Sequence, residues 1–460
     1  MSSDTLPLHG SRAVTVPFYR TIPALARDPL RAFEEIGQQH EGAIVRLDLG
    51  LFRPYLVSRP EHMQHVLRDN AENYVRDGMM WKPLRRMFGE GLGSEGPAWV
   101  HRRRLIQPMF SAKNIGTLLD GLNEAIGEAV DALDPYAQSG HPIDAGIQMT
   151  RIIHRALIRV FFGDGISTRD ADRLGHAITG AFTSLGARML LPFLPDSVPL
   201  PGDASFLRAT RTADDVMYSL IQRRRRELAG STMDTARDMI SLLCQARDEN
   251  GEPMDDQRVR NDAVSMFAGA SETSAVTMTW LWVVLDAHPE IADRLCDEID
   301  RVVGAGPPKP SHLPELVYTK MVLQELLRLY PVGWIIPRAT RESDVIDNVH
   351  IPGGSTVLVS PYLAHRLAEL WDRPLVFDPE RFSPDRAQRQ HRFAYLPFGG
   401  GPHQCLGSHF FMVEAQLIVA AMLSRYRPVL VRSGPVRPQA AATLRPRQRV
   451  KVMLRYRVPQ

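Results

Sequence analysis

The chain has 460 residues, of which 44% are hydrophobic and 23% charged, and its formal net charge is +3. This composition predicts a folded protein with a substantial core and excludes a disordered or low-complexity chain. Three cysteines, Cys244, Cys296 and Cys405, lie far apart in the sequence, which excludes a disulfide framework and a four-cysteine iron–sulfur domain. The same pattern predicts a reducing compartment.

The sequence predicts neither a membrane anchor nor a nucleic-acid site. No run approaches 18 apolar residues, and the N-terminus lacks the charged-then-apolar pattern of a signal peptide, so we expect a cytoplasmic protein. The four consecutive arginines at 223–226 are followed by Glu227 and lack aromatic neighbours for base stacking. We therefore interpret them as solvated charge at the end of a helix.

Two hairpins and an extended N-terminal arm are predicted outside the helices. The arm covers residues 1–25. Residues 43–51 and 54–58 alternate between apolar and polar side chains and predict the first hairpin. Residues 349–354 and 356–360 predict the second, turned at Pro352-Gly353-Gly354.

Helices are expected in most of the remaining chain. Prolines between residues 191 and 202 interrupt them and predict a loop that acts as a lid, and residues 248–256 form another polar loop. Long helical segments are predicted at 262–288, 321–330 and 406–418.

The stretch from Phe398 to Gly407 presents one cysteine inside a glycine-rich loop that leads into an apolar helix. Consecutive glycines allow the backbone to pass closely under a flat ligand. Cys405 would lie near the N-terminal end of the helix, where unpaired N–H groups stabilise a thiolate. A lone cysteine among apolar residues is more often simple packing, but loop, helix and cysteine together favour a thiolate that ligates haem iron.

Three further patterns have their own physical reasons. The 262–288 helix carries Gly269, Ala270, Glu272 and Thr273 at its middle; a central glycine costs roughly 1 kcal/mol relative to alanine, which indicates room for a ligand or close helix packing. Glu325 and Arg328 lie three residues apart among leucines, so burial would require each to satisfy the other. Trp99 and Arg103, four apart, can reach one anion from the same helical face.

At these residues the sequence resembles the cytochrome P450 haem-thiolate family, whose pattern Phe-x-x-Gly-x-Arg/His-x-Cys-x-Gly is met in full. The resemblance implies that Cys405 ligates the iron of haem b, that Phe398 shields the thiolate, and that His403 donates to a haem propionate. Gly401 would allow the tight loop and Gly407 the close approach of the helix. His403 stands where arginine is commoner, which implies a weaker or pH-sensitive propionate contact.

The resemblance assigns roles to the other patterns as well. Thr273 and Glu272 would manage protons during oxygen activation, beside a groove in which Ala270 stands where the family has glycine. Propionate binding would also involve Trp99, Arg103 and Arg338. A structural unit would join Glu325 and Arg328 to Arg381 of the Pro379-Glu380-Arg381-Phe382 segment. Arg102 and Arg104 are interpreted as solvated charges that steer an acidic partner.

The implied fold is mainly α with small β-sheets, a triangular prism of helices around buried haem, in one domain over residues 1–460. The implied partners are O2 and a ferredoxin or flavodoxin with its reductase, because no dinucleotide-binding loop is present. We expect a monomer, and we expect it to resemble the soluble bacterial members of the family.

The substrate pocket is the least constrained part of the family. Its candidate lining residues are Met79, Met80, Trp81, Phe182, Phe267, Trp334, Ile335 and Leu444, together with Arg188 as an anchor for a substrate carboxylate. For each of these, ordinary core packing is an equal alternative. The expected activity is hydroxylation or epoxidation of a small apolar terpenoid or polyketide. Oxidative phenol coupling, a peroxide-driven reaction and a non-catalytic haem sensor are the alternatives.

Overall fold

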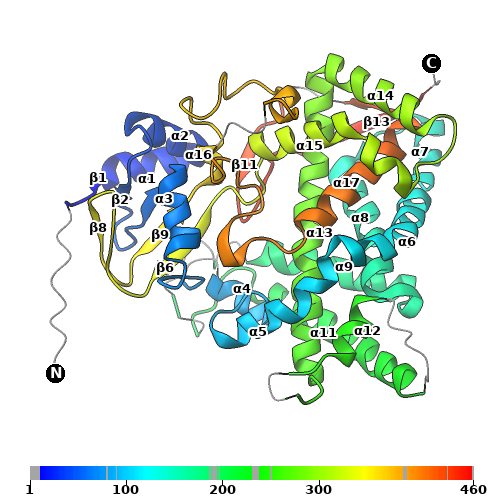
Figure 1. Cartoon of the computed structure of the whole chain (residues 1–460), viewed down its shortest axis with the longest axis horizontal. Helices are drawn as coiled ribbons and strands as arrows, with labels where there is room; N and C mark the ends of the chain where they lie inside the picture. Colours follow the sequence, from blue (N-terminus) through cyan, green and yellow to red (C-terminus); the bar gives the residue numbers. More distant parts are fainter. Residues whose placement is uncertain are drawn as a thin grey trace. The chain divides into compact units, whose positions relative to one another are not determined.

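The computed structural model describes residues 11–78, 81–89, 91–185, 188, 194–195, 197–230, 238–248, 251–386, 391–431 and 434–457. Helices dominate and the sheets are small (Figure 1). Contacts divide the chain into two compact units, each assembled from separate stretches of sequence. Unit 1 comprises Met1–Trp81, Leu327–Cys405 and Gln439–Leu444, and unit 2 comprises Lys82–Leu326, Leu406–Pro438 and Arg445–Gln460.

Unit 1 is built around a six-stranded sheet in the order β1-β2-β3-β9-β6-β4. Its core joins β-branched and aromatic side chains such as Val57, Val357 and Tyr74, all almost completely buried. The elements are β1 (Val14–Val16), α1 (Phe18–Arg27), α2 (Pro29–Gln39), β2 (Val45–Leu47), β3 (Tyr55–Val57), α3 (Pro60–Gln64), η1 (His65–Asp69), β4 (Tyr74–Val75), β6 (Ile336–Thr340), β7 (Asp344–Ile346), β8 (Val349–Ile351), β9 (Thr356–Val359), α16 (Pro361–Ala364), η5 (Pro379–Phe382) and η7 (Gly401–His403).

The first predicted hairpin is confirmed and the second is wrong. Strands β2 and β3 pair antiparallel, with Val45 opposite Leu56. In the second case β8 pairs with β7, whereas β9 pairs with β6 and β3. The reason is the turn at Asp347 and Asn348, whose φ angles are 47° and 59°. Positive φ at both central residues matches the twist of a two-residue hairpin, and Asp and Asn tolerate it.

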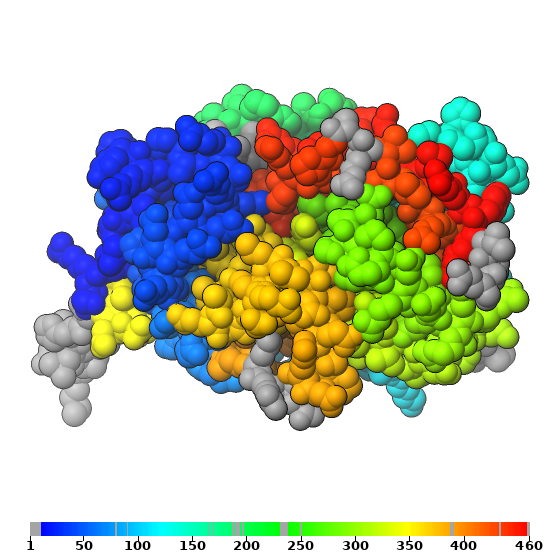
Figure 2. Space-filling view, turned by 90° about the horizontal axis from the view of Figure 1, so that it is seen from above, coloured from blue at the N-terminus to red at the C-terminus, as the bar shows by residue number. Residues whose placement is uncertain are grey.

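The N-terminal segment is not an extended arm throughout. Pro17 precedes helix α1, which runs from Phe18 to Arg27, and residues 1–10 lie outside the described residues. Ser11 forms an isolated parallel bridge with Val349. Figure 2 shows the corresponding blue and yellow segments on one face of the molecule.

Unit 2 is mostly helical. Its elements are α4 (Trp81–Phe88, of which Trp81 belongs to unit 1), α5 (Pro97–Ile106), η2 (Gln107–Phe110), α6 (Ala112–Asp131), α7 (Asp134–Ser139), β5 (Ile143–Asp144), α8 (Ala145–Phe162), η3 (Gly163–Gly165), α9 (Thr168–Ser184), α11 (Asp203–Ala229), α12 (Met239–Gln245), α13 (Asp256–Ala287), α14 (Pro289–Val303), η4 (Pro310–Glu315), α17 (Ser408–Leu423), β10 (Tyr426–Leu430) and β13 (Lys451–Tyr456). Helix α15 (Val317–Leu329) and the strand pair β11 (Pro438–Ala440) and β12 (Leu444–Pro446) cross the division between the units.

Helix α13 is the long central helix of unit 2 and packs against α8, α11, α12 and α17. The sequence predicted a helix over 262–288, and the structure begins it earlier, at Asp256. Asp255 caps the start, because its side chain accepts a hydrogen bond from the backbone N–H of Arg258. Most side chains of α13 are buried, so an accessible face on it requires an explanation.

Helix α17 is mostly apolar and buried almost throughout. Within the described residues, Gly401–Leu423 is one stretch long and apolar enough to cross a membrane, with a mean hydropathy of 1.5. The stretch is not an uninterrupted apolar run, because Glu414 and Gln416 lie within it, so the expectation that no run approaches 18 apolar residues still holds. Because 72% of its apolar window is buried inside the chain, the stretch has the character of a core helix.

Candidate active site

The loop before α17 holds Cys405 in a conformation that depends on glycine. Gly399 and Gly401 both have φ of 69°, and a Cβ at Gly401 would lie 1.7 Å from the carbonyl oxygen of Leu67. The N–H of Cys405 donates to the carbonyl of Phe398 at 2.9 Å and closes the loop. Gly407 occupies the N-cap position of α17. The loop thus places a cysteine immediately before a helix, in a backbone shape that only glycine allows.

The three cysteines differ in exposure. Cys405 is exposed, whereas Cys244 and Cys296 are buried. Burial raises the pKa of Cys244 to about 11 and also raises the pKa of Cys296, so neither forms a thiolate readily at neutral pH. Cys405 is therefore the cysteine that fits an axial thiolate ligand of haem.

The middle of α13 has one accessible face on an otherwise buried helix. Gly269 and Thr273 are exposed, while Ala270, Glu272 and Val276 are half-buried. A Cβ added at Gly269 would meet no atom within 4 Å. The Thr273 hydroxyl donates to the carbonyl of Gly269 at 2.6 Å. A bare helical face of this kind fits a flat cofactor and a small ligand, and it agrees with the expectation of room at this position.

Two carboxyl groups lie in or beside this region of α13. Burial raises the pKa of Glu272, against the opposing charge of Arg445. Glu414 of α17 is 1% exposed, and neither of its oxygens makes a hydrogen bond of regular geometry to a described residue. Burial raises the pKa of Glu414 to about 8, while the hydroxyl of Ser274 on α13 acts in the opposite direction. The sequence reasoning missed Glu414, because an acid in an apolar helix gives no signal of its depth.

Helix α5 carries three of the arginines discussed above, and one prediction about them was wrong. Trp99 is buried and Arg103 half-buried on this helix. Arg102 is not a solvated charge, because its guanidinium donates to Asp262 of α13 at 2.8 Å and both side chains are buried. Burial raises the pKa of Asp262 to about 6 although Arg102 acts to lower it. Arg104 is exposed, as expected.

Arg338 lies on β6 in unit 1 and is buried. Its guanidinium stacks over the Trp81 ring with 5.5 Å to the centroid, and Arg76 stacks over the same ring at 5.5 Å. The Trp81 indole N–H donates to the carbonyl of Pro337 at 2.8 Å. Two cations on one aromatic ring concentrate positive charge, which suits the binding of an anion such as a haem carboxylate.

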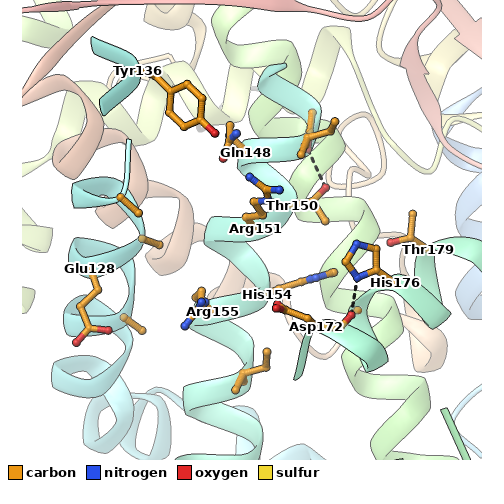
Figure 3. A pocket seen from close by; sticks show the side chains of 17 residues that line it. Glu128, Tyr136, Gln148, Thr150, Arg151, His154, Arg155, Asp172, His176 and Thr179 are labelled. Atoms are coloured by element: carbon orange, nitrogen blue, oxygen red, sulfur yellow. Dashed lines mark hydrogen bonds between the residues drawn. The ribbon is translucent and has the colours of Figure 1, made fainter. Parts of the chain in front are cut away.

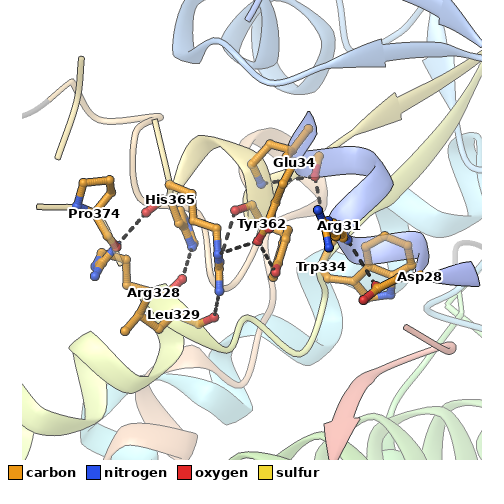
Figure 4. Close-up of polar contacts among 12 residues, drawn as sticks. Asp28, Arg31, Glu34, Arg328, Leu329, Trp334, Tyr362, His365 and Pro374 are labelled. Atoms are coloured by element: carbon orange, nitrogen blue, oxygen red, sulfur yellow. Dashed lines mark hydrogen bonds and ion pairs between the residues drawn. The ribbon is translucent and has the colours of Figure 1, made fainter. Parts of the chain in front are cut away.

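The three residues with a predicted structural role, Glu325, Arg328 and Arg381, are buried as expected. Glu325 and Arg328 of α15 are both 0% exposed, and Arg381 of η5 is 8% exposed. Arg328 donates to the carbonyls of His365 at 2.6 Å and Pro374 at 2.7 Å (Figure 4). Arg381 donates to the carbonyl of Arg373 at 2.8 Å. These arginines therefore hold an irregular backbone segment in place by satisfying carbonyls that no helix or sheet satisfies.

Several predicted pocket residues belong to the core. Phe267 is 0% exposed and packs against the rings of Phe161 and Phe162. Trp334 packs edge-on against Phe33 and donates its N–H to Ala441, and Leu444 is 0% exposed in the same cluster. The pocket prediction is therefore wrong for Phe267, Trp334 and Leu444, because apolar periodicity alone does not separate a lining residue from a core residue.

The other pocket candidates have mixed outcomes. Ile335 and Trp81 are half-buried, and Phe182 is half-buried with its ring near that of Phe88. Met79 and Met80 lie outside the described residues.

Arg188 binds within the chain instead of presenting its charge to a ligand. It is 3% exposed and makes a bidentate pair with Asp203, at 3.1 Å from Nε and 2.7 Å from Nη2. The same guanidinium donates to the carbonyls of Pro195 and Val198. The predicted substrate anchor is therefore corrected to a clamp that closes the loop before α11. That loop, expected to act as a lid, is described only at 194–195 and 197–202.

A groove of about 630 Å³ lies in unit 2 among α6, α7, α8 and α9 (Figure 3). Its lining includes His154, Arg151 and Arg155 of α8 and Asp172 and His176 of α9. The sequence reasoning did not single out these residues, because their spacing matches no motif. We call this feature the α8–α9 groove.

Comparisons with known proteins agree with the geometry of a haem-thiolate centre. The Cytochrome P450 family profile matches residues 13–454. The chain is 31% identical over 462 residues to a pentalenene oxygenase of Streptomyces avermitilis, with 100% of both chains covered. It is 32% identical over 421 residues to a cyclooctat-9-en-7-ol 5-monooxygenase of Streptomyces melanosporofaciens, covering 91% of this chain and 89% of that one.

Solved structures show the same fold. The haem domain of cytochrome P450DA superposes with a TM-score of 0.85 at 20% identity, covering 98% of this chain and 99% of that one. A cyanobacterial CYP120A1 with bound retinoic acid gives a TM-score of 0.83 at 20% identity, covering 97% and 99%. The chain therefore belongs to the cytochrome P450 family. It is an oxidoreductase of the monooxygenase class, and its cofactor is haem b.

Proposed function

We propose that this monooxygenase hydroxylates or epoxidises a small apolar terpenoid. Support comes from the names of the two relatives above, both of which are oxygenases of terpenoid skeletons and align over 91% or more of this chain. Arg188 is paired with Asp203 and is therefore not available to bind a substrate carboxylate, which favours an uncharged substrate.

The observation that carries the proposal is the exposed Cys405 in its glycine-dependent loop. We propose that its thiolate ligates haem iron, with Phe398 shielding the sulfur and with Gly401 and Gly407 shaping the loop around it. Bound haem supplies the iron at which O2 is reduced and cleaved. Residues 1–460 would then act as a single haem-binding domain.

The propionates and the proton supply are assigned to separate residues. Trp99, Arg103, Arg338 and His403 would bind the propionates through N–H donors. On the accessible face of α13, the Thr273 hydroxyl would turn from the Gly269 carbonyl to donate its hydrogen toward the oxygen site. Any proton that Thr273 passes on would be replaced from the Glu272 carboxyl. Burial raises the pKa of Glu272, which makes its carboxylate a better proton acceptor than that of an ordinary glutamate and so suits this task. Ala270 adds a methyl group beside this face.

Electrons would come from a ferredoxin or flavodoxin with its reductase, and the protein would act as a monomer in the cytoplasm. Exposed Arg104 remains a candidate for steering an acidic donor, whereas Arg102 does not, since Asp262 neutralises it.

The first test is the spectrum of the dithionite-reduced protein under carbon monoxide, for the wild type and for Cys405→Ser. A strongly red-shifted Soret band that is lost in the variant is expected; the same band in both proteins would refute the assignment of Cys405. Ferric protein is then titrated with a panel of cyclic terpenes and, as the comparison class, polyketide lactones. A low-spin to high-spin shift only with polyketides would refute the terpenoid assignment and leave the haem assignment intact.

A further inference from the structure

His154 of α8 makes a polar contact with the central helix α13. One ring nitrogen, Nε2, lies 2.5 Å from the hydroxyl oxygen of Ser271. Ser271 is 1% exposed and directly precedes Glu272 and Thr273. A buried hydroxyl has few alternative partners, so this contact fixes the side chain of Ser271 and, through it, the local position of α13.

The imidazole ring of His154 is closely packed by residues of α9 and α13. A Cβ at Gly175 of α9 would lie 2.4 Å from His154 Nδ1, so the ring occupies space that any other residue at 175 would fill. Gly175 stands inside a helix, where glycine costs roughly 1 kcal/mol relative to alanine. On another side the ring packs against Phe267 of α13, with centroids 5.5 Å apart. Three helices, α8, α9 and α13, therefore meet at this one side chain.

The contact also has one side open to water. His154 lines the α8–α9 groove, near His176 and Asp172 of α9 (Figure 3). Burial lowers the pKa of His154 to about 4, with a further lowering from His176 and a smaller raising from Asp172. The neighbouring Arg151 and Arg155 are exposed cations on the same helix. Near neutral pH the imidazole is uncharged, so it bonds to Ser271 without introducing a charge beside α13.

We infer that His154 is a positioning residue for oxygen activation, which acts through Ser271 to hold the Gly269–Thr273 segment of α13 in place. This inference rests on the proposed role of Thr273 and Glu272. Helix α13 is weakened at this segment by Gly269 and by the Thr273 hydroxyl, which bonds back to the Gly269 carbonyl at 2.6 Å. An anchor two residues from Thr273 opposes bending at this point.

Five single variants and one double variant of the haem-loaded protein test the inference. The single variants are His154→Leu, His154→Gln, Ser271→Ala, Thr273→Ala as reference, and His176→Ala as a control from the same groove. The first readout is hydrogen–deuterium exchange of peptides covering 262–278. We expect exchange there to rise at least fivefold in His154→Leu and Ser271→Ala and to stay near wild type in His154→Gln and His176→Ala. The double variant His154→Leu/Ser271→Ala should exchange no faster than the faster single variant.

The second readout is the rate at which reduced protein returns to the ferric state after mixing with oxygenated buffer, which requires no donor protein. We expect His154→Leu and Ser271→Ala to return several times faster than wild type, in the direction of Thr273→Ala. If His154→Leu lowers the melting temperature but leaves both readouts unchanged, the residue is merely structural and the inference fails. If Thr273→Ala leaves the return rate unchanged, the proposed role of Thr273 fails; exchange at 262–278 then still decides whether His154 positions the helix.

Discussion

Glu414 makes the stability of this protein depend on pH in an unusual direction. Burial sets the pKa of Glu414 at about 8 in the folded chain, compared with 4.5 for an ordinary glutamate. Folding therefore favours the protonated carboxyl, and its contribution to stability is fully present below pH 4.5 and is lost as the pH rises toward 8. Most buried acids with charged partners behave in the opposite way, because their pKa is lowered.

The replacement Glu414→Gln keeps the size of the side chain and removes its titration. One proton retained only by the folded state changes the free energy of unfolding by about 1.4 kcal/mol per pH unit. Between pH 6 and pH 8 the wild type should therefore lose about 2 kcal/mol relative to the variant. The constant cost of burying an amide instead of an acid cancels in this comparison.

The assay is urea denaturation of both haem-loaded proteins at pH 6, 7 and 8 and at constant ionic strength. Glu61→Gln, which alters an exposed carboxylate on α3, is the control. We expect the difference between Glu414→Gln and wild type to grow steadily with pH, and the difference for Glu61→Gln to stay flat. Parallel pH profiles for wild type and Glu414→Gln would show that the buried carboxyl does not hold its proton, and would refute the reasoning.

Two other changes have defined outcomes. Gly401→Ala places a methyl group 1.7 Å from the Leu67 carbonyl at a φ of 69°, so the loop must move; the red-shifted carbon monoxide band should be largely lost, whereas Gly306→Ala, with nothing within 4 Å, should keep it. Arg102→Met leaves Asp262 buried without its partner and should cost about 3 kcal/mol in urea melts, most of which Arg102→Met/Asp262→Asn should recover. A loss in the double variant as large as in the single one would show that the ion pair is not the cause.

Structural features that depend on residues close together in the sequence were predicted correctly. The loop around Cys405, the long helix that carries Thr273, and the buried pair of Glu325 and Arg328 depend on spacing and glycine content, and all three are where we expected them. The haem-thiolate class then followed from resemblance and is confirmed by the family match.

Prediction failed where the answer depends on partners distant in sequence. Arg102 stands among other basic residues and Arg188 beside Met189 and Leu190, and neither sequence context indicates that Asp262 or Asp203 neutralises the arginine. Phe267 and Trp334 are apolar residues at sensible spacings, but the side chains that surround them decide between pocket and core. The second hairpin failed for a local reason that we overlooked, the positive φ at Asp347 and Asn348.

Because the cysteines differ in exposure, thiol labelling can measure how much of the protein carries haem. Of the three thiols, only Cys405 is exposed, and it is the one assigned to the iron. A maleimide should therefore attach once to haem-free folded protein and not at all to loaded protein. Labelling stoichiometry would then count empty molecules in a preparation directly, without reference to absorbance or turnover.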